Sequence, residues 1–283
     1  MPELPEVETV KRGLEEFIIN ETIRKVYLSE LKLRFPWPKN FIFEVVGKKI
    51  VSIKRRAKYI IISLNQGYSI IAHLGMSGSY KVLKKNVPQD YIRLKHDHLV
   101  IELDNFILVY NDPRRFGYID LTNKEPEKHK FLSLLGPEPL SNSFNENDFA
   151  GSLLNKNKSI KNTLLDQSIV SGLGNIYVCE ALFRSKINPK KNCSKLITSK
   201  GKPREKLILL VNKINEVIKE AIDAGGSTLR DFSSTDGKMG YFQTSFYVYD
   251  RENEKCLLDD CGGVIKRVVQ SGRSTFFCSN CQK

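Results

Sequence analysis

The first three residues of the chain could carry covalent chemistry. Pro2 follows the initiator Met, and its small side chain favours removal of Met1, which would leave a free proline amine at the start of the chain. An α-amino group titrates near roughly 7.7–8.0, against roughly 10.4 for lysine, so part of it is unprotonated at neutral pH and can attack an electrophilic carbon. A secondary amine can also form a cationic iminium with a sugar carbon, and Glu3 could move a proton if burial raised its pKa. On these residues alone, a frayed start followed by a helix acid is the better explanation.

Four of the six cysteines lie close together near the C-terminus and suggest a metal site. Their spacing is C-x4-C-x16-C-x2-C, formed by Cys256, Cys261, Cys278 and Cys281. Zinc favours four thiolates in a tetrahedron, and two close pairs on two turns supply that geometry. Disulfides are the alternative, but an intracellular compartment disfavours them. We therefore predict one structural zinc ion, with Cys179 a small buried hydrophobe and Cys193 an incidental thiol.

Positive charge is concentrated in two segments. The net charge is +13, and residues 51–100 and 151–200 each hold nine Lys and Arg against two Asp and Glu. Such clustering suits a phosphate backbone held from two sides, which favours nucleic acid as the partner. An acidic membrane surface or a highly charged ligand comes next.

Length and composition restrict the class of protein. A chain of 283 residues predicts two domains, or two and a small module. A hydrophobic share of 41% with 10% aromatics excludes wholesale disorder. The longest apolar runs are far shorter than the roughly 18 residues of a membrane helix, and the N-terminus has acids where a signal peptide has Lys and Arg. We expect a soluble, cytoplasmic protein.

The elements that must position these residues change character along the chain. Pro5 and the acids beside it predict the start of a helix, with Val7, Val10 and Leu14 on one face. From there to about residue 121 the pattern is of strands rich in Ile, Val and Tyr, over 49–64, 68–73, 79–82, 98–103 and 105–110. The first part of the chain is therefore predicted to be a β-sandwich with one leading helix.

The pattern turns helical after a Gly-Pro-Glu-Pro hinge at 136–139. Short helical segments over 159–171 and 175–184 are joined by Gly-Leu-Gly, and a longer one over about 203–224 stops at Gly225 and Gly226. The longer segment carries a continuous apolar stripe, most simply a core face.

Motifs spread along the whole chain resemble the bacterial formamidopyrimidine-DNA glycosylase family. They are MPELPEVET at the start, RRAKY at 55–59, HLGMSG at 73–78, DPRRFG at 112–117, LLDQSIVSGLGNIYVCEALF at 164–183, GGSTLRDF at 225–232, STDGKMGYFQ at 234–243, and the cysteine ribbon. The resemblance implies an α+β protein: an N-terminal β-sandwich with a leading helix, then a helix–two-turn–helix domain ending in a zinc-ribbon β-hairpin. It also implies excision of oxidised purines such as 8-oxoguanine and formamidopyrimidines from duplex DNA, followed by strand cleavage at the abasic site.

The resemblance assigns four catalytic roles. Pro2 corresponds to the family's nucleophile, which attacks C1′ and forms a Schiff base, and Glu3 to its proton donor. Lys58 corresponds to the lysine that does acid–base work in β-elimination, and Arg273 to the arginine that binds phosphate and serves δ-elimination. Without the resemblance, Lys58 would be a solvated strand charge and Arg273 an exposed hairpin tip.

Other positions are implied to bind DNA. The segment over 226–243 resembles the family's loop that covers the extruded base. Asn157 stands where the family carries a DNA-contacting lysine, with Lys158 beside it. Met76, Arg114 and Phe116 match the side chains that fill the space left by the extruded nucleotide. The remaining implied DNA contacts are His96 and Asn175.

The predicted organisation is a catalytic β-sandwich over 1–135, a helical DNA-binding domain over 136–245 and a zinc ribbon over 246–283, acting as a monomer. The spacer of four residues between Cys256 and Cys261 is longer than the family's usual two, yet still within the range of zinc sites. Two alternatives stay open. One is an endonuclease VIII-type glycosylase for oxidised pyrimidines, and the other is a non-catalytic zinc-ribbon DNA-binding protein.

Overall fold

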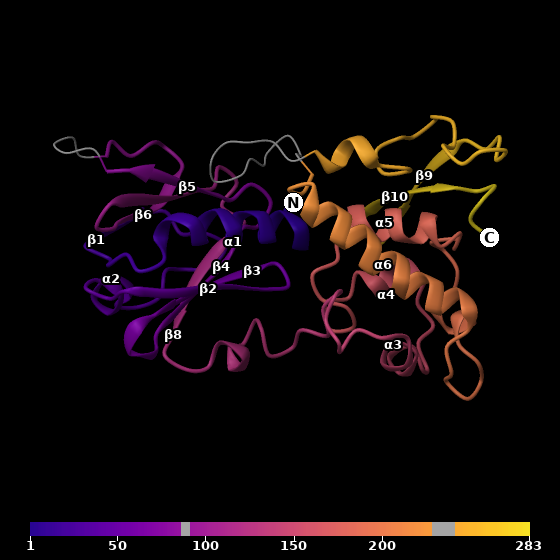
Figure 1. The fold of residues 1–283 in the computed structure, drawn as a ribbon, viewed down its shortest axis with the longest axis horizontal. Helices are drawn as coiled ribbons and strands as arrows, with labels where there is room; N and C mark the ends of the chain where they lie inside the picture. The colour runs from indigo at the N-terminus through magenta and orange to yellow at the C-terminus, as the bar shows by residue number, and fades with distance from the viewer. Residues whose placement is uncertain (86–90, 228–240) are drawn as a thin grey trace. The chain divides into compact units, whose positions relative to one another are not determined.

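A computed structural model describes residues 1–85, 91–227 and 241–283 (Figure 1). The chain divides into two compact units. The first unit comprises residues 1–133 and 224–241, and the second comprises residues 134–223 and 242–283. Among the described residues, no helix is long and apolar enough to cross a membrane.

Two four-stranded antiparallel sheets form the first unit (Figure 1). One has the strand order β1-β6-β7-β5 and the other β2-β3-β4-β8. Their inward side chains meet in one hydrophobic core, so the predicted β-sandwich is confirmed. The strands are β1 Lys25–Leu28, β2 Ile50–Arg56, β3 Tyr59–Leu64, β4 Ser69–His73, β5 Ser79–Lys84, β6 Asp97–Glu102, β7 Phe106–Asn111 and β8 Tyr118–Thr122.

The leading helix α1 (Leu4–Ile18) packs on this sandwich. Pro5 lies in its first turn, and its buried face carries Val7, Val10 and Leu14 into the core shared by the two sheets. The helix therefore has a fixed place, and the residues just before it are held against the sandwich. The described part of the unit also has a short helix α2 (Phe41–Val45) and 3-10 turns at Asn65–Gly67 and Pro126–Lys128.

The predicted strand over 49–64 is wrong in one respect, because it is two strands joined by a tight turn. Ala57 has a φ of 52°, in the left-handed region, and the chain reverses there so that Arg56 pairs with Tyr59. Both halves are rich in β-branched residues, which conceals the turn in the sequence. The consequence is functional, since Lys58 lies in this turn and not along a strand.

Helices are the main regular elements of the second unit. Its long helix α6 (Glu205–Asp223) buries the predicted apolar stripe. The predicted helix over 159–171 is shorter than expected, since α4 spans only Ile160–Leu164 and is followed by turns that lead into α5 (Asn175–Arg184). This is a helix–two-turn–helix arrangement. The other helical elements are α3 (Glu146–Ser152) and 3-10 turns at Cys193–Leu196 and Phe242–Ser245.

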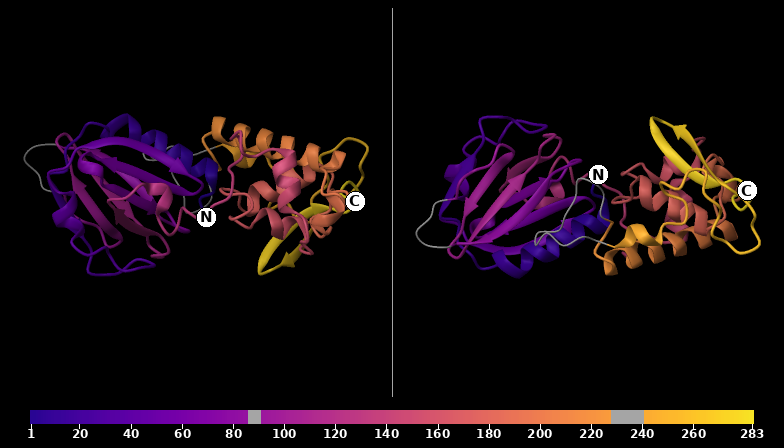
Figure 2. Two further views of the ribbon diagram at one scale, coloured as in Figure 1. Left: turned by 90° about the horizontal axis from the view of Figure 1, so that it is seen from below. Right: turned by 90° about the horizontal axis from the view of Figure 1, so that it is seen from above.

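The chain ends in a hairpin of two antiparallel strands, β9 (Ile265–Gln270) and β10 (Arg273–Cys278), which packs on α5 (Figure 2). Ser271 and Gly272 both have positive φ, at 47° and 74°, as a two-residue hairpin turn requires. Cys179 lies in the core between α5 and the hairpin as predicted. Cys193 is also buried, although its polar sequence neighbours suggested otherwise. Together the two units give the predicted α+β fold.

Candidate functional site

The start of α1 buries two carboxylates. Glu3 is the N-cap of the helix and only 2% exposed, and Pro2 before it is also buried. Glu6 Oε2 accepts a hydrogen bond from the Glu3 backbone N–H at 2.8 Å. The residue that would carry the free amine is thus held in place by the helix that follows it.

Glu6 also fixes a second segment of the first unit. Its Oε1 accepts from the Ser227 N–H at 2.8 Å and from the Ser227 hydroxyl at 2.9 Å. Gly226, with a φ of +78°, passes so close to the first turn of α1 that an added Cβ would lie 3.1 Å from Glu6 Oε1. Only the ends of the segment predicted to cover the extruded base are seen here, since residues 228–240 lie outside the described part of the chain.

The turn that carries Lys58 is held beside α1 by an ion pair between Arg55 and Glu8. Arg55 donates from Nε to Glu8 Oε2 at 2.9 Å and from Nη1 to the Ala57 carbonyl at 3.0 Å, which ties the turn between β2 and β3 to α1. Lys58 is 8% exposed, whereas Lys54 on β2 is exposed. A solvated strand charge is therefore not its role.

A hollow of about 650 Å³ lies on the first unit. Met1, the residue attached to the Pro2 amine, lines it together with His73, Met76, Arg114 and Phe116. Phe116 is 46% exposed and Arg114 lies over its ring at 5.1 Å, so Phe116 is not a core residue. Met1 therefore lines the same hollow as the three side chains that the sequence resemblance implies are inserted into DNA.

The two loops that bear these side chains are locked together. The Ser77 hydroxyl, from the first loop, donates to Asp112 Oδ1 at 2.5 Å and accepts from the Arg114 N–H at 3.2 Å. Asp112 is fully buried and also accepts from the Gly117 N–H at 2.8 Å. An added Cβ at Gly75 would collide with the backbone at Gly117. The loops over 73–78 and 112–117 therefore form one rigid support.

His73 faces the same hollow and was not selected from the sequence, although the HLGMSG motif contains it. Its ring is stacked on Tyr118, with centroids 5.4 Å apart. Its Nδ1 accepts from the Gly75 N–H at 3.0 Å, which leaves Nε2 as the donor of a neutral ring. Burial, followed by the positive charges of Lys58 and Arg34, lowers the pKa of His73 from 6.5 to about 4.

The low pKa of His73 predicts a pH-dependent loss of stability. Because the unfolded chain takes up a proton near pH 6.5 and the folded one only near pH 4, the stabilisation is complete above pH 6.5 and is lost as the pH falls through that window. We expect this residue to contribute up to about 3 kcal/mol of the fall in unfolding free energy. Urea unfolding at stepped pH should show a shallower decline in His73→Gln than in the wild type, and parallel curves would contradict the assignment.

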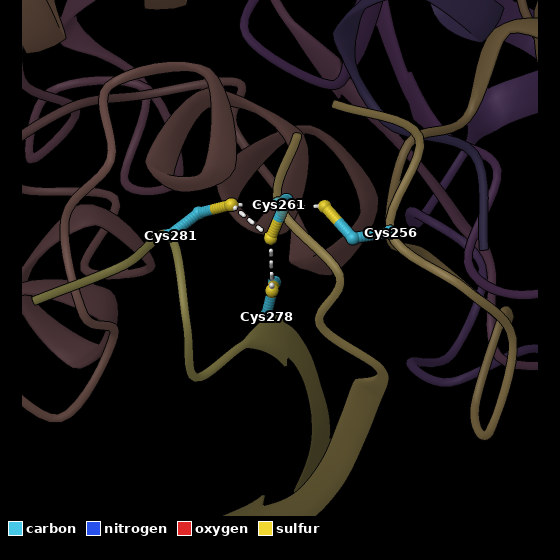
Figure 3. Close-up of side chains that lie close together, drawn as sticks. All are labelled: Cys256, Cys261, Cys278 and Cys281. Atoms are coloured by element: carbon cyan, nitrogen blue, oxygen red, sulfur yellow. Dashed lines mark hydrogen bonds between the residues drawn. The ribbon is translucent and has the colours of Figure 1, made fainter. Parts of the chain in front are cut away.

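Four thiols converge in the second unit (Figure 3). The Sγ atoms of Cys256, Cys261, Cys278 and Cys281 all lie within 4.8 Å of one another. The Cys256–Cys281 and Cys261–Cys278 pairs are 3.7 and 3.6 Å apart, close to the edge of roughly 3.8 Å of a tetrahedron with zinc–sulfur bonds of about 2.3 Å. The Cys281 thiol donates to Cys261 and lowers the pKa of Cys261 to about 6, toward the thiolate that a metal binds. The longer first spacer thus still allows one structural zinc ion.

Arg273 is the first residue after the hairpin turn and is exposed. The tip that carries it is anchored to the helix–two-turn–helix arrangement. Lys161 of α4, which is 0% exposed, donates from Nζ to the Ser274 carbonyl at 2.8 Å and to Thr275 Oγ1 at 2.7 Å. Asn175 at the start of α5 donates from Nδ2 to the same Ser274 carbonyl at 2.9 Å. The Asn175 amide, which the sequence resemblance implies as a DNA contact, thus also supports the hairpin.

Replacing Lys161 should free the hairpin tip more than it destabilises the fold. Lys161→Met removes two donors but also removes the desolvation of a buried ammonium, so we expect a change of about 1 kcal/mol or less in unfolding free energy. Amide exchange around Ser274 should accelerate by about tenfold, measured by mass spectrometry. Lys158→Met, three residues away and exposed, is the matched control. Unchanged exchange in Lys161→Met would show that Lys161 does not anchor the tip.

The remaining predicted DNA contacts lie apart from these clusters. His96 precedes β6, and its carbonyl accepts from the Asp112 N–H at 3.0 Å, so it adjoins the loop of Arg114. Asn157 and Lys158 are exposed in the second unit, and Lys158 Nζ lies 3.9 Å from Asp166. The sequence offered no sign of Lys161 as a supporting residue, because burial of a polar residue by distant segments leaves no local pattern. Asp112 lies in the DPRRFG motif, but its supporting role was not apparent there.

Comparisons with known protein families agree along the chain. The model of the formamidopyrimidine-DNA glycosylase N-terminal domain matches residues 1–119, and that of the H2TH domain of the same enzyme matches residues 135–233. The model of a zinc finger found in FPG and IleRS matches residues 253–283.

Whole proteins and solved structures are similar over their full lengths. The chain is 47% identical to the formamidopyrimidine-DNA glycosylases of Agrobacterium fabrum and Rhodopseudomonas palustris, with 100% of each chain covered. It is 36% identical to a Lactococcus lactis Fpg variant bound to DNA containing Fapy-dG, with a TM-score of 0.87 and full coverage of both chains. The chain is also 36% identical to the Lactococcus lactis Fpg bound to DNA with an abasic site, with a TM-score of 0.86 and full coverage of both chains.

Proposed function

Because the chain belongs to the formamidopyrimidine-DNA glycosylase family, we propose that it removes oxidised purines from duplex DNA and then cleaves the strand at the abasic site. The reaction is base-excision repair by a bifunctional glycosylase and lyase. The observation that carries the assignment of residues is the hollow shared by Met1, Met76, Arg114 and Phe116. It places the start of the chain beside side chains suited to hold an opened duplex.

In the proposed first step, the Pro2 amine attacks C1′ of the damaged nucleotide. The C1′–N bond breaks, and the base leaves with the bonding electrons and takes up the proton that the attacking amine loses. Glu3 protonates O4′ as the C1′–O4′ bond opens, and the amine and C1′ become an iminium. Burial of Glu3 at the N-cap holds this carboxyl next to the nucleophile in the chain.

Strand cleavage follows from the iminium. That cation accepts electrons, so the C2′ proton can be removed and the C3′–O bond broken, which releases the 3′ phosphate. The buried side chain of Lys58, as the neutral amine, would accept the C2′ proton and become an ammonium. A second elimination breaks the C5′–O bond, and Arg273 would hold that departing phosphate. The zinc ion, bound by the four cysteines, organises the ribbon that presents Arg273.

The test of this proposal is a panel of duplexes. Cleavage of a strand with 8-oxoguanine opposite cytosine, leaving phosphates at both new ends, is the expected result. Faster cleavage at thymine glycol would favour the endonuclease VIII-type alternative. Binding without any cleavage would favour the non-catalytic zinc-ribbon protein.

The inserted side chains should matter for damaged bases and not for empty sites. Extruding a nucleotide costs a few kcal/mol in lost stacking unless the gap is filled. Met76→Ala and Phe116→Ala should therefore slow excision of paired 8-oxoguanine by about tenfold or more, while cleavage of a pre-formed abasic site changes little. Arg114→Ala should also relax the preference for cytosine opposite the lesion. Equal losses on both substrates with a lowered melting temperature would contradict this role.

The proposal includes the wider organisation of the protein. Residues 1–135 would be the catalytic part, 136–245 the DNA-binding part and 246–283 the zinc ribbon, in a monomer that works in the bacterial cytoplasm on the nucleoid. His96, Asn157, Lys158 and Asn175 are proposed as contacts to the DNA backbone, which positions the duplex without reading its sequence. The support for the four DNA contacts is the resemblance of the sequence around them to the family's motifs.

A further inference from the structure

A strongly basic loop in the second unit has no part in the chemistry proposed above. Residues 186–206, here called the basic loop, hold eight Lys and Arg and a single acid, Glu205. They run from just after α5 into the first turn of α6 and include the 3-10 turn at Cys193–Leu196. Such a density of one charge on a connecting segment points to a polyanionic partner.

The basic loop has a fixed backbone. Its tip is a small hairpin in which the Thr198 N–H donates to the Lys202 carbonyl at 2.9 Å and Ile197 pairs with Pro203. Gly201 completes the turn with a φ of +75°. Arg204 donates from Nε to the Ile197 carbonyl at 2.9 Å, which orients its guanidinium. The charges are therefore presented on a preformed surface.

The loop is joined to the segment that carries Asn157 and Lys158. The Cys193 N–H donates to the Lys158 carbonyl at 3.0 Å, and the Ile160 N–H donates to the Lys191 carbonyl at 2.8 Å. Two adjoining hollows, of about 560 and 550 Å³, share Lys195, Thr198 and Arg204 as lining residues. The first of them is also lined by Lys156 and Asn157. The basic surface thus continues from residue 156 across the loop.

Several of these charges have no carboxylate partner among the described residues. Across residues 1–85, 91–227 and 241–283, no carboxylate forms an ion pair with Lys156, Lys195, Lys200, Lys202 or Arg204. By contrast, Lys213 on α6 lies 2.6 Å from Glu216. Hydroxyls of Thr198 and Ser199 line the first hollow beside the charges and can donate to phosphate oxygens.

We infer that the basic loop is a second grip on the backbone of duplex DNA, continuous with the 156–158 segment. The inference rests on the proposed function for the identity of the polyanion as DNA. Lysines at this surface would replace condensed counterions along the phosphates, so they would add affinity and salt dependence without sequence preference. They would also supply positive charge beside Asn157, which is itself neutral.

Neutralising the loop tests the inference. The variant Lys195→Gln, Lys200→Gln, Lys202→Gln changes exposed side chains only. The dissociation constant for an undamaged duplex of about 30 base pairs, three helical turns, is measured over a series of salt concentrations. The slope of log K against log salt should become shallower by about 1 to 3, because about 0.9 is lost for each phosphate contact.

The matched control is Lys39→Gln, Lys124→Gln, Lys219→Gln, which removes the same net charge from exposed positions outside the loop. Its slope should stay close to that of the wild type. Equal slopes in all three proteins, or equal reductions in both variants, would overturn the inference. Binding of the wild type to phosphatidylglycerol vesicles that is lost in the loop variant, with DNA slopes unchanged, would assign the loop to membranes instead.

The undamaged probe separates this inference from the proposed function. If the wild type did not cleave 8-oxoguanine duplexes, the proposed function would be contradicted. The salt slopes would still report whether the basic loop contacts phosphates. Normal cleavage by the wild type with unaltered slopes in the loop variant would sink the inference alone.

Discussion

Protein that retains Met1 should be unable to form the covalent intermediate. Met1 is bonded to the Pro2 nitrogen and lines the hollow of the first unit. With Met1 present that nitrogen is an amide, whose lone pair is delocalised and cannot attack C1′. We expect cleavage of 8-oxoguanine duplexes to fall by at least about 1,000-fold in Pro2→Gln, whose bulky second residue retains Met1.

Two further variants locate the nucleophile. Pro2→Gly, which still allows removal of Met1, keeps a terminal amine with a pKa near roughly 8 and should retain part of the activity. Borohydride should trap wild-type protein on DNA through a peptide that begins at Pro2, and Lys58→Met should still be trapped. A sugar adduct on Lys58, or full activity in protein that starts at Met1, would refute the assignment.

Loss of the zinc ligands should unfold the ribbon and abolish tight DNA binding. Four thiolates and a structural zinc contribute about 10–16 kcal/mol of apparent binding free energy in small zinc modules, and the metal orders the chain around it. Cys278→Ser removes a buried ligand at the end of β10. We expect the bound zinc to fall from one ion per chain to none, and amides over 265–278 to lose their exchange protection.

A matched cysteine variant controls for general damage. Cys193→Ser alters a buried thiol outside the cluster, whose Sγ donates to the Lys156 carbonyl at 3.4 Å, a bond that serine can also make. It should keep its zinc and its DNA affinity. Metal-free protein that still binds and cleaves lesion DNA would show that the ribbon does not depend on zinc.

Periodic elements and chemical motifs could be read from the sequence. Val7, Val10 and Leu14 recur at helical spacing and do face the core, and the stripe of α6 is buried as expected. Such patterns are local, because one amphipathic face is written within a few turns of chain. The turn at Ala57 could not be read from the sequence, because the segments on both sides of it favour strands equally.

The sequence by itself determined the chemistry that is available: a proline at the chain start, four cysteines in two pairs, and an excess of positive charge in two segments. Only the tertiary structure decided which of many similar residues are used. Lys58 and Lys161 are buried while Lys54 and Lys158 are exposed, although all four are lysines. Burial and hydrogen-bond partners come from residues distant in the chain, such as Ser274 for Lys161. Residue type therefore follows from the sequence, whereas solvation and geometry follow from the fold.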